Sequence, residues 1–239
     1  NGVVFGAAFD ENFNVYHKAA YSFEEAKAFR GSKYVQSNVG NCFKQVKELL
    51  EKDRFVYFSG TPCQVAGLVS YLKKDYDKLI TQDFICHSVP SPLVWDSYKA
   101  YLQEEFGGKI TNVSFRAKEK DKKGYKLLLT FDNGKKYMGD GNDPYMKAFI
   151  EGLSSNSSCI SCKFKGNNRY SDITLGDFWG VEDICEDFND YNGVSLVLLH
   201  SEKALSLFEA IKKDVLFVEI SSDKVFNKNQ MAVKSVYEN

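Results

Sequence analysis

The sequence predicts an α/β protein, with α+β as the alternative, whose mixed and largely parallel sheet is flanked by helices. Strand-like apolar runs alternate with helix signals through the first third of the chain. Near residues 108–140 the alternation gives way to consecutive strand-like runs with a strong hairpin turn between two of them. This pattern indicates an inserted β-hairpin region. We therefore expect a single core over residues 1–220 and a C-terminal tail or helix over 221–239.

The first third supplies most of the expected parallel layer. The capping box Ser22-Phe23-Glu24-Glu25 begins one helix. Asn41 begins a second helix, whose apolar face carries Val46 and Leu50. The strands of this part are expected at residues 3–9, 14–20, 54–59 and 79–86. This alternation predicts helices that cover the sheet.

The remaining elements follow from the same signals. A helix over 92–106 ends at Gly107-Gly108, and Asp132-Asn133-Gly134 predicts the hairpin turn. Further strands are expected at 110–115, 125–131, 135–138, 173–175, 194–199 and 215–220, and further helices at 144–153 and 203–212.

Composition narrows the class of protein. The 239 residues are 44% hydrophobic and 26% charged with a formal net charge of −1, as in a globular protein without an obvious nucleic-acid partner. No apolar run approaches the roughly 20 residues of a membrane span, so we expect no membrane contact. Six cysteines are too few for a disulfide scaffold and favour metal or redox use in the cytoplasm. The chain begins in a strand without a methionine, and we expect upstream sequence to be missing.

Cys63 lies where a protein presents a reactive or metal-binding sulfur. It follows the apolar run 55–58, and Thr61, Pro62 and Gln64 predict a helix start with a capping box. The thiol then falls in the first helical turn, where free N–H groups and the helix dipole favour a thiolate. A buried structural thiol is the alternative for Cys63.

Three further cysteines are candidate ligands. Cys159 and Cys162 form a CxxC pair that can chelate one metal, although redox use or ordinary cysteines remain alternatives. Cys86 ends the predicted strand 79–86, so it and Cys63 would share the edge where parallel strands end. Four such thiolates could hold zinc or a 4Fe–4S cluster, and spacing alone does not separate these metals. We expect no special role for Cys42 or Cys185.

Two other segments are candidate binding sites. The loop 31–37 is small, polar and basic, which suits a phosphate or the edge of a flavin ring, although an ordinary connecting loop explains it too. The strand at 172–177 leads into Asp177 between glycine and aromatic residues. His87, next to Cys86, could donate a hydrogen bond to a cluster or cofactor, or be a structural histidine. The chain has no P-loop, GxGxxG or GxSxG motif.

Together these motifs resemble the coenzyme F420 hydrogenase/dehydrogenase beta-subunit family. The resemblance covers residues from about 2 to about 213, and its motifs occur in the expected order. They are Gly60-Thr61-Pro62-Cys63-Gln64-Val65-Ala66-Gly67-Leu68, Cys86-His87-Ser88-Val89-Pro90-Ser91-Pro92, Cys159-x-x-Cys162 and Asp172-Ile173-Thr174-Leu175-Gly176-Asp177-Phe178-Trp179-Gly180.

The resemblance implies a flavin- and iron–sulfur-dependent oxidoreductase that transfers electrons and hydride. Its cluster ligands would be Cys63, Cys86, Cys159 and Cys162, holding a 4Fe–4S cluster. FAD would be contacted by Lys33 above all, and by Ser32, Gln36, Thr61, His87 and Asp177. The implied partners are a redox protein, either a ferredoxin-like domain or another subunit, and a hydride donor or acceptor such as a deazaflavin or nicotinamide. No catalytic residue follows from the motifs.

The chain departs from the family pattern at its start. Relatives usually carry a glycine- and serine-rich motif before the first strand of this sequence, and often a ferredoxin-like domain before that. Neither occurs here, so the sequence leaves open whether the flavin site is complete. The alternative function is a non-catalytic binding or accessory domain, with a structural four-cysteine zinc site or with its cofactors lost.

Overall fold

The computed structural model describes residues 2–118, 124–188, 193–228 and 232–235. The chain divides into two compact units. Unit 1 comprises Asn1–Phe5, Asn41–His87 and Cys162–Asn239, and unit 2 comprises Gly6–Gly40 and Ser88–Ser161. The expected single core over 1–220 stays a prediction.

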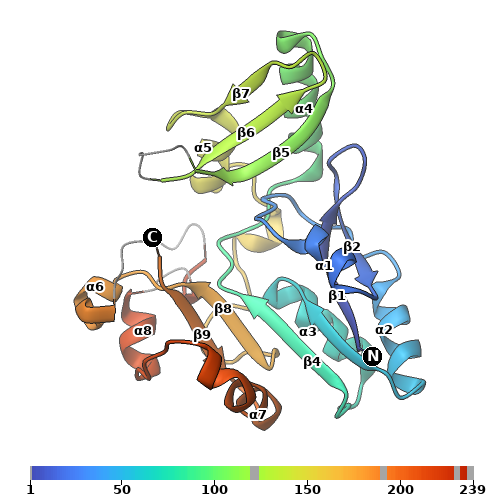
Figure 1. The fold of residues 1–239 in the computed structure, drawn as a ribbon. Helices are drawn as coiled ribbons and strands as arrows, with labels where there is room; N and C mark the ends of the chain where they lie inside the picture. Colours follow the sequence, from blue (N-terminus) through green and yellow to red (C-terminus); the bar gives the residue numbers. More distant parts are fainter. Residues whose placement is uncertain (1, 119–123, 189–192, 229–231, 236–239) are drawn as a thin grey trace. The chain divides into compact units, whose positions relative to one another are not determined.

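A mixed, largely parallel sheet confirms the predicted fold class (Figure 1). Its strand order is β2-β1-β3-β4-β8-β9. Parallel pairing joins β1 to β3, β3 to β4 and β4 to β8, whereas β9 is antiparallel to β8. The strands are β1 (Gly2–Phe9), β2 (Val15–Ala20), β3 (Phe55–Ser59), β4 (Leu79–Phe84), β8 (Ile173–Asp177) and β9 (Ser195–Leu199).

One face of the sheet in unit 1 is packed against helices. Phe58 on β3 is completely buried, and its ring meets Phe43 of α2 edge-on at 5.9 Å. Farther along the sheet, Leu196 of β9 packs in a small core with Val225 of α8. The helical segments of unit 1 are α2 (Cys42–Glu51), α3 (Pro62–Leu72), α6 (Val181–Ile184), η3 (Glu186–Phe188), α7 (Glu202–Ile211), η4 (Lys212–Asp214) and α8 (Ser222–Lys228).

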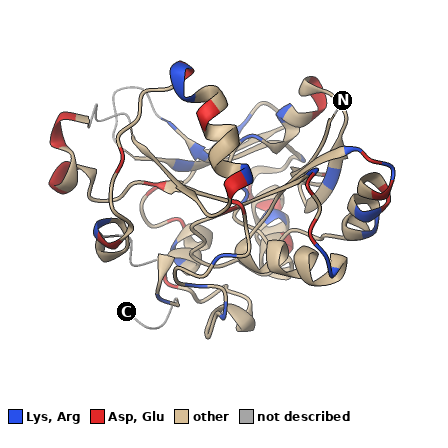
Figure 2. Ribbon diagram, turned by 90° about the horizontal axis from the view of Figure 1, so that it is seen from below, with Lys and Arg blue, Asp and Glu red and all other residues tan. Residues whose placement is uncertain are grey.

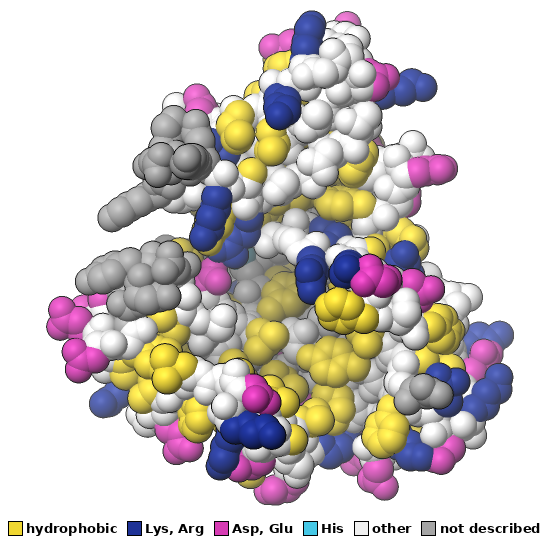
Figure 3. All heavy atoms as spheres, in the orientation of Figure 1, with side chains coloured by type: hydrophobic (Ala, Val, Ile, Leu, Met, Phe, Trp, Pro, Cys, Tyr) yellow, Lys and Arg dark blue, Asp and Glu magenta, His cyan; other side chains and the backbone are white. Residues whose placement is uncertain are grey.

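The opposite face of this sheet carries exposed apolar side chains. Phe84, Leu175 and Val197 lie side by side in register on β4, β8 and β9. They are 39%, 37% and 42% exposed, whereas parallel sheets are usually covered on both faces. Figure 3 shows hydrophobic side chains over the strands of unit 1 on the face turned to the viewer.

Unit 2 is organised around an aromatic core. Trp95 is completely buried and packs against the rings of Phe115 and Tyr145, each at 5.0 Å. The antiparallel sheet β5-β6-β7 covers this core. Besides β2, the elements of unit 2 are α1 (Phe23–Ala26), η1 (Lys27–Phe29), α4 (Pro92–Phe106), β5 (Ile110–Ala117), β6 (Lys126–Phe131), β7 (Lys136–Met138), α5 (Pro144–Ile150) and η2 (Ser157–Cys159).

The inserted hairpin is confirmed at its turn. Gly134 has φ 81°, a left-handed conformation that glycine adopts without strain, and it connects β6 to β7. Residues 119–123 of the predicted hairpin region lie outside the described residues, as do 229–231 and 236–239 of the predicted tail. Within that tail, residues Ser222–Lys228 form α8.

The structure corrects some of the predicted elements. Residues 215–220 form no strand in the described chain, although Val215 has an extended backbone. Leu216 is 88% exposed and Phe217 packs edge-on to Phe208 of α7, so this apolar run lacks the neighbouring strand that its pattern requires. The helix predicted to reach residue 153 ends at Ile150, and the one after Ser22 is a single turn followed by η1.

Side-chain charges are mixed along most elements (Figure 2). Several of the ion pairs are i,i+3 or i,i+4 pairs on helix surfaces, such as Lys44–Glu48 on α2. In the part of the chain that the structure describes, no helix is both long and apolar enough to cross a bilayer.

Candidate functional site

Cys63 lies where the sequence predicts, at the start of α3. Thr61 is the N-cap, its hydroxyl accepts a hydrogen bond from the Gln64 N–H at 3.4 Å, and the Gln64 side chain accepts one from the Thr61 N–H at 2.9 Å. The capping box is therefore confirmed. The Thr61 hydroxyl also lies 3.0 Å from the sulfur of Cys63, which is exposed. A hydroxyl at this distance can donate to a thiolate.

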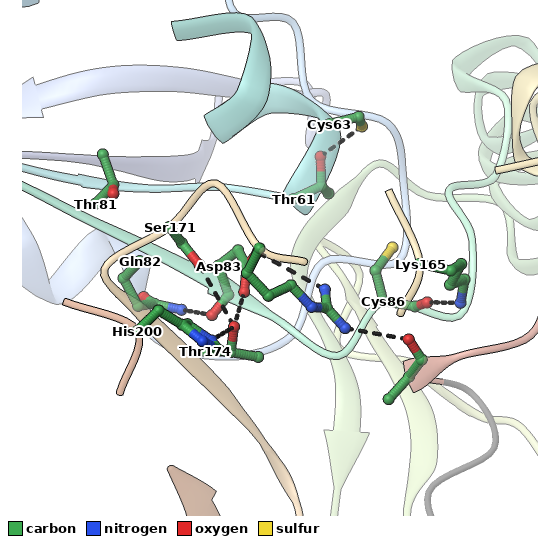
Figure 4. A network of polar contacts seen from close by, with 12 residues as sticks. Thr61, Cys63, Thr81, Gln82, Asp83, Cys86, Lys165, Ser171, Thr174 and His200 are labelled. Atoms are coloured by element: carbon green, nitrogen blue, oxygen red, sulfur yellow. Dashed lines mark hydrogen bonds and ion pairs between the residues drawn. The ribbon is translucent and has the colours of Figure 1, made fainter. Parts of the chain in front are cut away.

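Cys86 follows the neighbouring parallel strand. The register of β3 and β4 pairs Ser59 with Gln82, so Cys63 and Cys86 both follow the carboxyl ends of adjacent strands (Figure 4). The strand itself ends at Phe84, two residues earlier than predicted, although the Ile85 N–H still donates to the Leu175 carbonyl at 2.9 Å. Cys86 therefore belongs to the loop after the strand, which a ligand can approach.

The loop that follows Cys162 is tied to this edge. The ammonium of Lys165 donates a hydrogen bond to the carbonyl oxygen of Cys86 (Figure 4). Lys165 is the third residue after the candidate ligand Cys162. It thereby brings a positive charge to the backbone of a second candidate ligand, Cys86. A cation beside several thiolates would offset their mutual repulsion.

The CxxC pair is divided between the two units. Cys162 belongs to unit 1 with Cys63 and Cys86, whereas Cys159 ends η2 in unit 2. None of the four thiols forms a disulfide, and Cys86, Cys159 and Cys162 are half-buried. Among the described residues, no three side chains of His, Cys, Asp and Glu are gathered so that they could hold a metal ion. The donor set fits a thiolate-bound metal by its chemistry, and the choice of ligands stays a prediction.

A buried polar network of unit 1 includes Asp83, three residues before Cys86 (Figure 4). Asp83 on β4 accepts a hydrogen bond from the Thr174 hydroxyl of β8, and the Thr174 oxygen lies 2.9 Å from Nε2 of His200. Because the single hydroxyl proton of Thr174 is used toward the carboxylate, His200 must donate through Nε2. The chain of hydrogen bonds therefore runs from the exposed His200 to a carboxylate that is 1% exposed.

Arg169 is the cation of this network and is incompletely satisfied. Its Nη1 lies 3.7 Å from Oδ2 of Asp83, and the two side chains are 2% and 1% exposed. Its Nη2 donates to the Ala232 carbonyl at 3.2 Å. Nε, Nη1 and Asp83 Oδ2 have no hydrogen-bond partner among the described residues. Such buried orphans are rare, because each unmade hydrogen bond costs stability.

Desolvation shifts the pKa of the titratable group at each end of the network. Desolvation raises the pKa of Asp83 above its usual range, although the Thr174 hydrogen bond, the Arg169 charge and Ser171 act in the opposite direction. Desolvation likewise lowers the pKa of His200, with a further contribution from Arg169, while Asp172 opposes it. Both shifts disfavour the charged form of the group.

The other two candidates of unit 1 lie beside these residues in sequence. Asp177 is the last residue of β8 and is exposed, and Trp179 after it is 56% exposed. His87 is half-buried and directly follows Cys86. Asp177 therefore ends β8 and His87 follows the end of the parallel strand β4, at the edge of the sheet that carries Cys63. Their role toward a cofactor stays a prediction.

The loop with Ser32, Lys33 and Gln36 belongs to unit 2. The Lys33 ammonium donates to the carbonyls of Phe29, Arg30 and Gly31 at 3.4, 3.1 and 3.2 Å. It also lies 5.4 Å from the ring centre of Phe9. Burial lowers its pKa to about 8.

Gln36 is anchored at both its backbone and its side chain. Its N–H donates to the Pro90 carbonyl at 2.9 Å, and its side-chain oxygen accepts from Asn156 at 3.0 Å. Ser32 in the same loop is half-buried. Lys33 and Gln36 thus already support the fold of unit 2, and their contact with a flavin stays a prediction.

Sequence reasoning missed Arg169, Asp83, Thr174 and His200. Arg169 lies in a polar run after Cys162 that carries several basic residues, and nothing in the sequence distinguishes the buried one. The one available signal was Asp83, an acidic residue inside an otherwise uncharged strand.

Comparison with known proteins supports the sequence-based resemblance. The family model for the C terminus of the coenzyme F420 hydrogenase/dehydrogenase beta subunit matches residues 53–224, which is more than half of the chain. The chain belongs to this family. A comparison with curated protein sequences gave no significant match.

A solved structure agrees with the fold. A chain from the xenon-derivatised F420-reducing [NiFe] hydrogenase complex of Methanosarcina barkeri superposes with a TM-score of 0.54 at 15% sequence identity. The superposition covers 95% of this chain and 77% of that one. At this identity the likeness supports the fold alone.

Proposed function

We propose that the chain is an electron- and hydride-transfer subunit that uses FAD and one 4Fe–4S cluster, and that it works in the cytoplasm. The observation that carries the proposal is the arrangement of thiols in unit 1. Cys63 and Cys86 follow adjacent parallel strands, and Lys165 ties the loop after Cys162 to the Cys86 carbonyl. Membership of the beta-subunit family adds the redox role.

The four proposed ligands are Cys63, Cys86, Cys159 and Cys162. When bound, a flavin accepts or donates two electrons as hydride and an iron–sulfur cluster carries them singly. The task of the chain is to supply thiolates and to balance their charge. Thr61 offers a hydroxyl at 3.0 Å from the Cys63 sulfur, and Lys165 supplies a cation at Cys86. Such hydrogen bonds and charges tune a cluster's potential.

For the flavin we propose contacts from Ser32, Lys33, Gln36, Thr61, His87 and Asp177, as the family resemblance implies. Partners would be a redox protein, either a ferredoxin-like domain or another subunit, and a deazaflavin or nicotinamide that exchanges hydride. The similar chain from Methanosarcina barkeri belongs to an F420-reducing hydrogenase complex, which supports a subunit partner.

The decisive experiment is anaerobic purification with iron, sulfide, zinc and flavin analysis and a visible spectrum. We expect about four irons and four sulfides per chain, with broad visible absorption. Cys63→Ser and Cys159→Ser should each abolish iron binding. Cys185→Ser is the matched control, because Cys185 is also free and half-buried but lies outside the proposed ligand set.

Two outcomes would overturn the cluster. One zinc per chain would favour a structural four-cysteine site in a binding or accessory domain. Equal iron loss in Cys63→Ser and Cys185→Ser would show that the ligand assignment is wrong.

A further inference from the structure

Residues 232–235, here called the C-terminal segment, pack on the loop between Cys162 and Arg169. Both belong to unit 1, and the segment lies beyond residue 224, where the family match ends. Ala232 is completely buried and Ser235 is 4% exposed, although neighbouring stretches of the chain are mostly polar. Burial of both residues indicates that this segment makes a specific packing contact.

Two residues of this segment accept three donors from the loop. The Ser235 hydroxyl accepts the Cys162 N–H at 3.1 Å. The Ala232 carbonyl accepts the Gly166 N–H at 2.8 Å and Arg169 Nη2 at 3.2 Å, so both of its lone pairs are used. Gly166 has φ 95°, a left-handed conformation that turns its N–H toward this acceptor.

The loop is held from its other side by its own cations. Lys165 donates to the carbonyl of Cys86, and Arg169 faces the Asp83 carboxylate on β4 at 3.7 Å. The loop therefore lies between two sets of contacts, one to the end of β4 and one to the C-terminal segment. Loops without such contacts open readily, whereas a backbone bonded on both sides is kept in one conformation.

We infer that the C-terminal segment is a clamp for the Cys162 loop and that Ser235 is a positioning residue for the Cys162 thiol. Ser235 binds the backbone amide of Cys162 itself, so it fixes the direction in which that residue projects its sulfur. This role for a metal ligand rests on the proposed function. The clamp as a contact within unit 1 does not, so the two can be tested separately.

The test compares Ser235→Ala with Ser235→Thr in the full chain. Ser206→Ala is the control, because Ser206 is an exposed serine inside α7 of unit 1. Hydrogen exchange of the Cys162 amide and alkylation of the Cys162 thiol are measured in the reduced apoprotein by mass spectrometry. We expect Ser235→Ala to accelerate both roughly tenfold, as for the loss of one hydrogen bond that holds the loop closed. Ser235→Thr and Ser206→Ala should match the parent chain.

Titration with Co²⁺ of the same reduced proteins adds a spectroscopic readout. Thiolate-bound cobalt absorbs in the visible and near ultraviolet, and Ser235→Ala should weaken its binding about 10- to 100-fold. Unchanged exchange and alkylation in Ser235→Ala would overturn the clamp. If the parent chain binds no Co²⁺ through its cysteines, the proposed ligand set fails instead, and the exchange rates alone then decide the clamp.

Discussion

Each unit buries charged side chains, but the two units satisfy them differently. In unit 2, the Lys99 ammonium binds the Asn12 carbonyl, the Asn14 side chain and Asp96 at 2.6, 2.8 and 2.9 Å. In unit 1, Arg169 and Asp83 face each other at 3.7 Å with unpartnered atoms on both sides among the described residues.

Asp143, like Lys99, has its charge satisfied by several protein groups of unit 2. Its carboxylate accepts hydrogen bonds from the hydroxyls of Tyr98 and Tyr137 and from the Met146 N–H, each at 2.7 Å. The buried charges of unit 2 are thus completed by protein groups and support an aromatic core. Among the described residues, the network of unit 1 keeps unpartnered atoms close to the candidate ligand Cys86, and such atoms are rare enough to call for an explanation in strain or function.

The largest expected effect is loss of the buried cation in unit 1. Arg169→Met should lower the free energy of unfolding by about 3–5 kcal/mol, because it leaves the Asp83 carboxylate buried without a counter-charge. Urea denaturation measures the change. Adding Asp83→Asn to Arg169→Met should restore part of the loss, since neither charge then remains. Additive losses in the double variant would mean that the two side chains are not coupled.

Removal of the hydrogen-bonded Asp143 charge in unit 2 should lower the free energy of unfolding by less than the loss of Arg169 does. Asp143→Asn should lower the free energy of unfolding by about 1–3 kcal/mol, because two tyrosine hydroxyls lose a charged acceptor. Burial, assisted by Asp143, raises the pKa of Tyr137 to about 12. The variant should therefore also lower that pKa, which ultraviolet absorption of tyrosinate measures. A Tyr137 titration that stays unchanged would contradict the role of Asp143.

His200, at the exposed end of the unit 1 network, predicts that the stability of the folded chain depends on pH. The pKa of His200 in the folded chain lies below the usual 6.5, so the unfolded chain binds the proton more readily. Stability should therefore fall as the pH drops through 6.5 toward the lowered value. His200→Gln keeps a donor for Thr174 without titrating, so it should lose less stability between neutral and mildly acidic pH. Parallel losses in urea denaturation would argue against the shift.

The smallest expected effect is a lowered pH midpoint for acetylation of Lys33 in unit 2. Because burial lowers its pKa to about 8 from 10.5, Lys33 should be mostly neutral at pH 9. Brief treatment with acetic anhydride across a pH series should acetylate this lysine with a midpoint near pH 8, as measured by peptide mass spectrometry. In the Lys33→Arg variant the peptide that is acetylated at Lys33 should be absent, which identifies that peptide in the parent chain. A midpoint above pH 10 would mean that the three carbonyls around the ammonium outweigh burial.

Local sequence signals succeeded where neighbouring residues decide the structure. The capping box of Thr61 and Gln64, the helix Pro92–Phe106 and the turn at Gly134 were all predicted. They depend on a few adjacent side chains and on glycine's freedom at positive φ. The predicted strand at 215–220 failed because a strand forms only with a neighbour to pair with, and its apolar composition is no evidence of one.

By itself, the sequence determined the mixed parallel fold, the family and the positions of the candidate thiols, because strand–helix alternation and short motifs are local. Only the tertiary structure decided that Arg169 and Asp83 meet, that Lys165 binds the Cys86 carbonyl and that Ser235 binds the Cys162 amide. These contacts join residues that are 73 to 86 positions apart in the chain. Burial and hydrogen-bond completion depend on what packs beside a residue, and no local pattern in the sequence specifies that.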